Sequence, residues 1–264
     1  MHRGLYAGAS AMLVQQYGLD VVANNLANVS TVGFKRRKPI GESFPGYLVE
    51  RREANRGAPW AGPDGVLFNR VLIGGMYTTV VMNETYSVQE MGTMIHTDNP
   101  LDVCILQEGH FFKVSDGNGN VFYTRAGSFT LDPEGNLVTQ DGFYVLGEGD
   151  EPIAVEGQAV EIGENGEVFV DGEAVGALAL YSFEDPGRMR QVGKNLWQET
   201  PWSGPAVPVE EVSLRSRYLE ASNVNAVEEM VAMVEASRAY EAASRMVQLH
   251  DESTGRMIDS FGRV

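Results

Sequence analysis

The sequence predicts an α+β protein whose N- and C-terminal α-helices pair as a coiled coil, with a central mainly-β domain between them. Apolar residues recur at steps of three and four near both ends of the chain, and short apolar runs separated by Gly, Asn and Asp turns fill the middle. The 264 residues are enough for about two domains. We therefore expect a terminal helical domain (1–35 and 220–264), an extended excursion or linker (36–75) and a β-rich domain (76–219).

The first helix is expected to run from Gly4 to Ala27. Its apolar seam advances in steps of four and three and contains one polar member, Gln16. Gly8 within this helix is about 1 kcal/mol less favourable than Ala, so we expect close packing or a bend there. The seam consists of Leu5, Ala9, Met12, Gln16, Leu19, Ala23 and Leu26.

The end of this helix is rich in asparagine, which forms helices poorly because its side chain competes for backbone hydrogen bonds. Asn24, Asn25 and Asn28 either cap the last helical carbonyls or also fix the register with a neighbouring subunit. Gly33 should then allow a turn with positive φ, and Phe34 can anchor that turn in a neighbouring apolar site.

The second helix is expected to begin after an N-cap at Asn225, with Glu228 three residues later as in a capping box. Gly255 should interrupt this helix near its end, and residues 261–264 should fray. The apolar stripe of this helix consists of Met230, Met233, Ser237, Tyr240, Ser244 and Val247, widened by Val227, Val231 and Val234.

Turn sequences divide the region between the helices. The excursion at 36–75 is rich in Pro and Gly, which predicts irregular or extended chain. After it, short apolar runs alternate with turn signals, which is typical of a compact all-β domain. These turns are expected at 116–119, 132–135, 141–142 and 164–167.

The net charge of −16 argues against nucleic acid as a partner, because phosphate binding needs clustered Lys and Arg. The charge is uneven: the first 38 residues are basic, and the residues from 220 onward are acidic. We expect the two ends to attract each other. The basic run at 35–38 is interpreted as a solvated cluster that can also dock an acidic surface on a neighbouring copy.

Catalytic, cofactor-binding and metal-binding patterns are not apparent, so we expect neither an enzyme nor a bound cofactor. His96, Asp98, Asp102 and His110 match no metal-ligand spacing, and we expect them on strand edges and in loops. Cys104 is the only cysteine and lies in the apolar run LDVCIL, which predicts an inert thiol in a buried strand and no intramolecular disulfide. Apolar runs fall short of the ~18 residues typical of a membrane span.

Motifs at both ends resemble the signatures of the flagellar rod and hook protein family of bacteria. The first is ANNLANVSTVGFKR (23–36), preceded by GLYAGASAM, and the second is YLEASNVNAVEEMVAMVEASRAYEAASRMV (218–247). Between them, NPLDVCILQEGHFFKV and YTRAGSFTLDPEGNLVTQDGFYVLG resemble the family's β-domain signatures, although His110 stands where an acidic residue or glycine is expected before FF. The resemblance covers most of the chain and is weakest over 36–90.

The resemblance implies a structural subunit of the basal-body rod that polymerises helically through its terminal helices, as part of the axial drive shaft and export channel. Its partners would be copies of itself, neighbouring rod and hook subunits, the flagellar type III export apparatus and surrounding ring proteins, without nucleic acid or membrane insertion. The subunit would reach the periplasm-spanning rod without a cleaved signal peptide. The assembly interface would comprise Leu5, Met12, Leu19, Asn24, Asn25, Leu26, Asn28, Gly33, Phe34, Asn223, Asn225, Val227, Met230, Val234, Tyr240 and Val247.

Two alternatives stay open at this point. The long excursion at 36–75 favours the distal rod protein, which we expect, whereas the tail DESTGRMIDSFGRV resembles the proximal rod protein. From another class, the terminal helices could form a closed coiled-coil oligomer that presents the β domain as a scaffold or adhesin. A fixed stoichiometry would distinguish that oligomer from a growing rod.

Overall fold

The computed structural model describes residues 3–43, 47–55, 67–76, 80–155, 157, 160–193 and 195–261. The chain divides into two compact units. The first consists of Met1–Asp20, Pro39–Glu84 and Val234–Val264, and the second of Val21–Lys38 and Thr85–Met233. The predicted fold class is confirmed, since two terminal helices flank a mainly-β centre.

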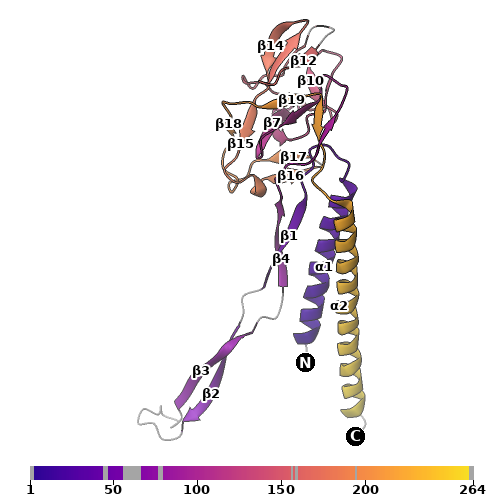
Figure 1. Cartoon of the computed structure of the whole chain (residues 1–264). Helices are drawn as coiled ribbons and strands as arrows, with labels where there is room; N and C mark the ends of the chain where they lie inside the picture. The colour runs from indigo at the N-terminus through magenta and orange to yellow at the C-terminus, as the bar shows by residue number, and fades with distance from the viewer. Residues whose placement is uncertain are drawn as a thin grey trace. The chain divides into compact units, whose positions relative to one another are not determined.

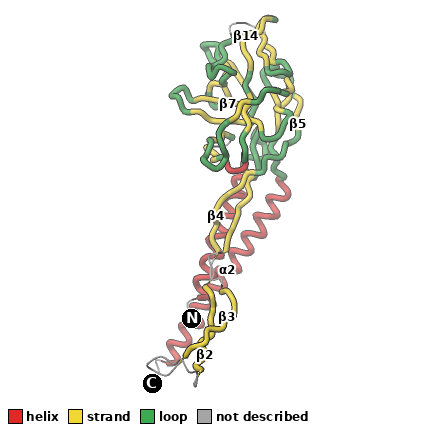
Figure 2. Tube along the Cα trace, turned by 90° about the vertical axis from the view of Figure 1, so that its left-hand side faces the viewer, coloured by secondary structure: helices red, strands yellow, loops and turns green. Residues whose placement is uncertain are grey.

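Helix α1 (Arg3–Ala27) and helix α2 (Ala226–Phe261) run side by side in opposite directions (Figures 1 and 2). Glycines bring them close together in the first unit. A Cβ added to Gly4 would lie 2.2 Å from Nε2 of His250. One added to Gly8 would lie 2.7 Å from Cγ2 of Val247. Close packing therefore explains Gly8, as the sequence predicts.

The packed face of α1 is not the predicted apolar seam. Gly4 and Gly8 each precede a seam residue, Leu5 or Ala9, by one position, which is a rotation of about 100° around the helix. Small residues allow the two backbones to approach, so the glycine face packs on α2 and the larger side chains stay outside. The most exposed are Tyr6, Leu13 and Tyr17, at 64%, 57% and 58%.

Helix α2 begins as predicted. The backbone N–H of Val227 donates to Oδ1 of Asn225 at 3.0 Å, and Nδ2 of Asn225 donates to Oε1 of Glu228 at 3.3 Å. The predicted interruption at Gly255 is wrong, because α2 continues to Phe261. One glycine opposes the helix by only about 1 kcal/mol, which the helix on both sides outweighs. Fraying was predicted for residues 261–264, but Phe261 is still helical, and residues 262–264 lie outside the described residues.

Three described strands begin in the region 36–75, which was expected only to be an extended excursion, and a fourth strand follows at the start of the region expected to be β-rich. Strand β1 (Arg37–Ser43) pairs with β4 (Val80–Ser87). Strand β2 (Tyr47–Asn55) pairs antiparallel with β3 (Leu67–Met76). Parts of the Pro- and Gly-rich sequence between these strands lie outside the described residues. Strand pairing depends on a partner elsewhere in the chain, so composition alone did not reveal it.

The β domain of the second unit consists of short strands joined by loops (Figure 2). Its described pairings are antiparallel. The largest sheet has the order β16 (Arg190–Val192), β17 (Leu196–Gln198), β8 (Val121–Thr124), β7 (His110–Ser115), β11 (Tyr144–Val145), β10 (Leu137–Thr139) and β9 (Phe129–Leu131). Beside it, β15 (Leu180–Ser182) pairs with β7 and with β18 (Val207–Pro208).

Smaller sheets complete this domain. They are β12 (Val160–Ile162) with β13 (Glu167–Val170) and β14 (Glu173–Ala177), β19 (Leu214–Ser216) with β6 (Val103–Ile105), and β20 (Tyr218–Glu220) with β5 (Met94–His96). A short 3-10 helix, η1 (Pro186–Arg188), follows β15. The last strand, β20, includes residue 220, at which the C-terminal helical segment was predicted to begin.

The predicted turns connect β7 to β8, β9 to β10, β10 to β11 and β12 to β13. A glycine with positive φ occupies each of them, for example Gly166 at +87°. The core lies between the sheets and includes Phe112, Val168 and Leu178, all fully buried. Cys104 in β6 is buried as predicted, and burial raises the pKa of its thiol to about 11, so the thiol is protonated at neutral pH.

Candidate assembly interface

The side of α1 that turns away from α2 carries large apolar residues. Tyr6, Leu13 and Tyr17 follow one another at spacings of seven and four, which puts them on one side of the helix, and we call them the α1 apolar face. The predicted interface residues Leu5 and Met12 are next to members of this face and are half-buried. Leu19 and Leu26 are half-buried as well.

Helix α2 exposes a second apolar face near its start. Val227, Met230 and Val231, which we call the α2 apolar face, are 69%, 52% and 53% exposed. Large apolar side chains gathered at a surface mark interaction sites, because their burial is favourable. Of the other predicted interface residues on α2, Val234 is 50% exposed, and Tyr240 and Val247 are half-buried.

Asn25 is buried and joins the end of α1 to two other segments of its own chain. Its Nδ2 donates to the carbonyl of Arg37 at 2.9 Å and to Oε2 of Glu229 at 3.1 Å. Its Oδ1 accepts from the backbone N–H of Arg37 at 3.0 Å. The side chain is 1% exposed, so these contacts satisfy its polar atoms within the chain.

Asn28 caps α1, as one of the two interpretations predicts. Its Nδ2 donates to the carbonyl of Asn24 at 2.8 Å, and its Oδ1 accepts from Oγ1 of Thr31 at 3.2 Å. Asn24 itself is exposed. A role for Asn24 in fixing the register between copies therefore stays a prediction, whereas Asn25 and Asn28 have partners in their own chain.

The turn after α1 is held by backbone geometry. Gly33 has φ +67°, which confirms the predicted positive value. A Cβ on Gly33 would lie 2.5 Å from the backbone N of Ala126, so the turn also fits tightly against the β domain. Phe34 is 1% exposed and is therefore buried in its own chain.

The interpretation of the basic run as a solvated cluster is wrong for Lys35 and Arg36 and holds for Lys38. Lys35 is fully buried. Arg36 forms ion pairs at the start of α2, from Nε to Oε1 of Glu229 at 2.6 Å and from Nη1 to Oε2 of Glu228 at 3.4 Å. The predicted attraction between the oppositely charged ends is thereby confirmed. Lys38 is exposed, and burial lowers the pKa of the half-buried Arg37 guanidinium.

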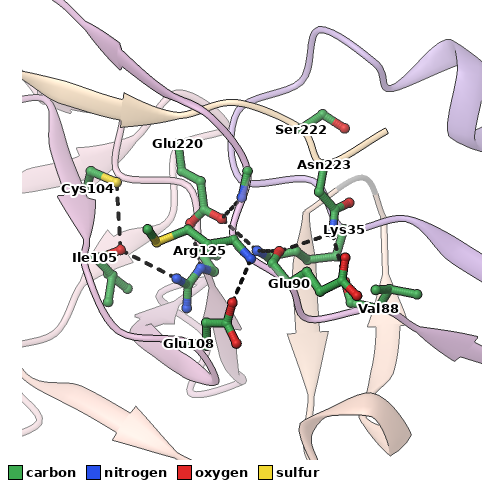
Figure 3. A network of polar contacts seen from close by, with 12 residues as sticks. Lys35, Val88, Glu90, Cys104, Ile105, Glu108, Arg125, Glu220, Ser222 and Asn223 are labelled. Carbon is green, nitrogen blue, oxygen red and sulfur yellow. Dashed lines mark hydrogen bonds and ion pairs between the residues drawn. The ribbon is translucent and has the colours of Figure 1, made fainter. Parts of the chain in front are cut away.

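A buried charge cluster lies between the turn after α1, the β domain and β20 (Figure 3). Glu220 binds two cations: its Oε1 is 2.6 Å from Nζ of Lys35, and its Oε2 is 2.5 Å from Nε of Arg125. Oε1 also accepts from the backbone N–H of Gly92 at 2.9 Å. All three charged side chains are 1% exposed or less. We call Lys35, Arg125 and Glu220 the charge cluster.

Backbone carbonyls complete the coordination of the two cations. Nζ of Lys35 donates to the carbonyl of Glu90 at 2.6 Å. Nη1 of Arg125 donates to the carbonyl of His110 at 2.9 Å, and its Nη2 to that of Ile105 at 3.4 Å. Desolvation lowers the pKa of the Lys35 ammonium, and attraction to Glu220 opposes that effect.

Asn223 continues this network toward α2. Its Oδ1 accepts from the backbone N–H of Arg36 at 2.7 Å. Its Nδ2 donates to the carbonyls of Val88 and Glu90 at 2.9 and 3.1 Å (Figure 3). Asn223 was predicted as an interface residue, and here it ties three segments of one chain together. Asn225 serves as the cap of α2, as described above.

The residues considered for metal binding have structural contacts instead. His96 in β5 stacks edge-on against Tyr218, with ring centroids 4.9 Å apart. Oδ1 of Asp102 accepts from Nδ2 of Asn99 at 3.0 Å. Burial lowers the pKa of His110, with the charge of Arg125 as a second cause. Within the described residues, no group of three or more potential ligands could hold a metal ion.

Sequence reasoning missed Arg125, Glu220 and Glu229. Each lies in a segment that resembles the family's signatures, YTRAG or YLEASNVNAVEE, but a position in a motif does not reveal whether the side chain is buried. The opposite charges of the two chain ends predicted a contact between them, but did not identify the residues that form it.

Comparison with known proteins gives three matched segments. Residues 5–35 match the family described as flagella basal body rod protein, 105–170 the flagellar hook protein FlgE/F/G D1 domain, and 215–260 the flagellar basal body rod FlgEFG protein C-terminal region. The three segments include Lys35, Arg125 and Glu220, respectively.

Relatives match over nearly the whole chain. The flagellar basal-body rod protein FlgG of Agrobacterium fabrum is 34% identical over 262 residues, covering 95% of this chain and 96% of the relative. FlgG of Bacillus subtilis is 32% identical over 273 residues, covering 98% and 99%. The flagellar basal-body rod protein FlgF of Caulobacter vibrioides is 33% identical over 266 residues and covers both chains fully.

These matches support the rod subunit over the closed oligomer, because they extend across both terminal helices and the β domain. In the part of the chain that the structure describes, neither helix has an apolar stretch able to cross a membrane. The chain therefore belongs to the flagellar basal-body rod protein family and is a structural, non-enzymatic subunit of the bacterial flagellar basal-body rod.

Proposed function

We propose that this rod subunit polymerises with copies of itself and with neighbouring rod and hook subunits through the α1 and α2 apolar faces. The single observation that carries this proposal is that the pairing of α1 with α2 uses a glycine face and leaves the larger apolar side chains exposed. A helix with an uncovered apolar stripe gains free energy by burying it against another chain. Leu5, Met12 and Leu19, predicted as interface residues, would enlarge the contact.

The test is the variant Met230→Glu in the full-length chain. Met230 is exposed, so the monomer should keep its stability to within about 0.5 kcal/mol. In a polymer the new carboxylate would be buried without a partner, which opposes each contact by several kcal/mol. We expect monomer yield and unfolding to be unchanged, while rod growth in sedimentation and motility in cells are lost.

Gln198→Glu is the matched control, because it adds the same charge at an exposed position in β17 of the β domain. That control should assemble normally. Normal rod growth by Met230→Glu would overturn the proposed use of the α2 apolar face.

We propose the distal type of rod subunit. The support is that most of the similar proteins are FlgG proteins, among them those of Agrobacterium fabrum and Bacillus subtilis. The FlgF protein of Caulobacter vibrioides is 33% identical, so the proximal type is the second candidate. Locating the subunit along purified basal bodies with a tag separates the two types. The export apparatus and surrounding ring proteins are further proposed partners, on the basis of family membership.

A further inference from the structure

The charge cluster holds more positive than negative charge in a site closed to water. Lys35 and Arg125 are 0% and 1% exposed, and Glu220 is the only carboxylate among the described residues that bonds to both. Glu108 also acts on Lys35 through its charge, but it is exposed and therefore screened by solvent. The burial of both cations thus depends on one side chain.

The three members come from distant parts of the sequence. Lys35 follows α1, Arg125 follows β8, and Glu220 ends β20, so Lys35 and Glu220 are 185 residues apart. The main chain of the Glu220 region is also fixed, since its carbonyl accepts from the N–H of Gly33 at 2.8 Å. A Cβ on Gly92 would lie 1.9 Å from the carbonyl oxygen of the neighbouring Ala221. The carboxylate therefore enters the site only when β20 is in place.

We propose that Glu220 completes the fold by permitting the burial of Lys35 and Arg125, so that the segment after α1, the β domain and β20 become ordered in one cooperative step. Without Glu220, two cations would lie in the interior with only backbone carbonyls as partners, and a buried charge without a counter-ion is strongly unfavourable. The stability of the β domain consequently depends on the segments that follow α1 and precede α2. A chain whose C-terminal segment has not docked cannot hold this site closed.

This proposal predicts an unusual order of stabilities. Glu220→Gln keeps the shape of the side chain but leaves two buried cations without a counter-charge. Lys35→Met removes one cation and leaves a neutral pair of Arg125 and Glu220. The double variant Lys35→Met with Glu220→Gln contains one buried cation fewer than Glu220→Gln. Adding Lys35→Met should therefore restore part of the stability that Glu220→Gln loses. A purely steric role of Glu220 would not produce this rescue.

The experiment is urea unfolding of the dilute full-length chain, followed by tryptophan fluorescence for the β domain and by far-ultraviolet circular dichroism for the helices. Trp197 is fully buried in that domain, and replacing Trp60 and Trp202 with phenylalanine in every variant makes it the single tryptophan that reports on the domain. We expect Lys35→Met to unfold near the wild-type midpoint, Glu220→Gln to unfold at a much lower urea concentration or without a cooperative transition, and the double variant to regain part of that loss.

Two results would overturn the proposal. One is a Glu220→Gln midpoint equal to that of Lys35→Met. The other is a double variant whose urea midpoint is no higher than that of Glu220→Gln. If Glu220→Gln shows no cooperative transition, the equivalent result is a double variant that also shows none. The unfolding is measured at a dilution at which sedimentation finds the chain monomeric. Neither result then depends on the polymerisation proposed above, and the two proposals fail separately.

Discussion

Replacing Asn25 with alanine is predicted to destabilise the monomer, although this residue was predicted from sequence as part of an interface between subunits. The side chain is 1% exposed and makes three hydrogen bonds, two to the backbone of Arg37 and one to the carboxylate of Glu229. Asn25→Ala removes all three, and leaves the half-buried backbone of Arg37 and the buried carboxylate of Glu229 without these bonds. The neighbouring Asn24 is exposed and provides a matched control.

The magnitude follows from the partners left behind. A neutral hydrogen bond contributes about 1 kcal/mol net, a bond to a charged group about 1.5–3 kcal/mol, and an unsatisfied buried group adds its desolvation penalty. We expect Asn25→Ala to lose about 3–5 kcal/mol of the free energy of unfolding. That is a large part of the roughly 5–15 kcal/mol typical of a native protein. Asn24→Ala should change it by less than about 0.5 kcal/mol.

The assay is urea unfolding of dilute monomer beside the critical concentration for rod growth. With a slope of about 2–3 kcal/mol per molar urea, the Asn25→Ala midpoint should fall by roughly 1–2 M. Asn25→Asp should be worse than Asn25→Ala, because it sets a second carboxylate against Glu229 and removes the donor. A wild-type midpoint for Asn25→Ala together with lost rod growth would refute this reasoning and assign Asn25 to the contact between copies.

Three further predictions follow from the geometry. Gly33→Ala should destabilise the chain by about 2 kcal/mol or more, since φ is +67° and the new Cβ would lie 2.5 Å from the backbone of Ala126. Gly18→Ala, inside α1 with open space around it, should instead stabilise the chain by up to about 1 kcal/mol. Thermal melts of the two variants beside the wild type check both. The Cys104 thiol should resist alkylation at pH 8 in the native protein, because its pKa is raised to about 11, and mass spectrometry should find it modified only after unfolding. Hydrogen bonds from the side chains of Asn120 and Asn136 hold the pKa of Asp116 and of Asp132, respectively, below the usual 3.8. The contribution of these two carboxylates to stability is therefore complete above pH 3.8 and is lost as pH falls through the lower folded pKa values. Replacing Asp116 and Asp132 with asparagine should make acid unfolding less steep in a circular dichroism titration.

Local patterns in the sequence predicted local structure well. The expected first helix starts one residue after the observed Arg3 and ends with it at Ala27, and the cap at Asn225 is confirmed. Helix periodicity, caps and glycine turns depend on residues that are close in sequence, so one sequence is enough to predict them. The turn glycines, including Gly33, were predictable for the same reason.

Features that depend on distant partners were not predictable in the same way. The sequence pattern favoured the large apolar side chains of α1 as its packed face, but the glycines allow a closer approach of α2 and decide the contact. Lys35 was assigned to solvent because a basic run usually lies there, and only its partner Glu220, 185 residues away, makes its burial possible. The pairing of β2 with β3 likewise joins segments that carry no alternating apolar pattern.

The accessibility of Val231 in assembled rods tests the central claim most directly. Val231 is 53% exposed in the chain, and the natural Cys104 is buried, so a Val231→Cys variant offers one reactive thiol. We predict fast maleimide labelling of the monomer and at least about tenfold slower labelling in purified basal bodies, with full labelling restored when the rods are dissociated, because 1.4 kcal/mol of protection is already a tenfold effect. Equally fast labelling in the monomer and in the intact rod would contradict the proposal that the α2 apolar face is buried between subunits.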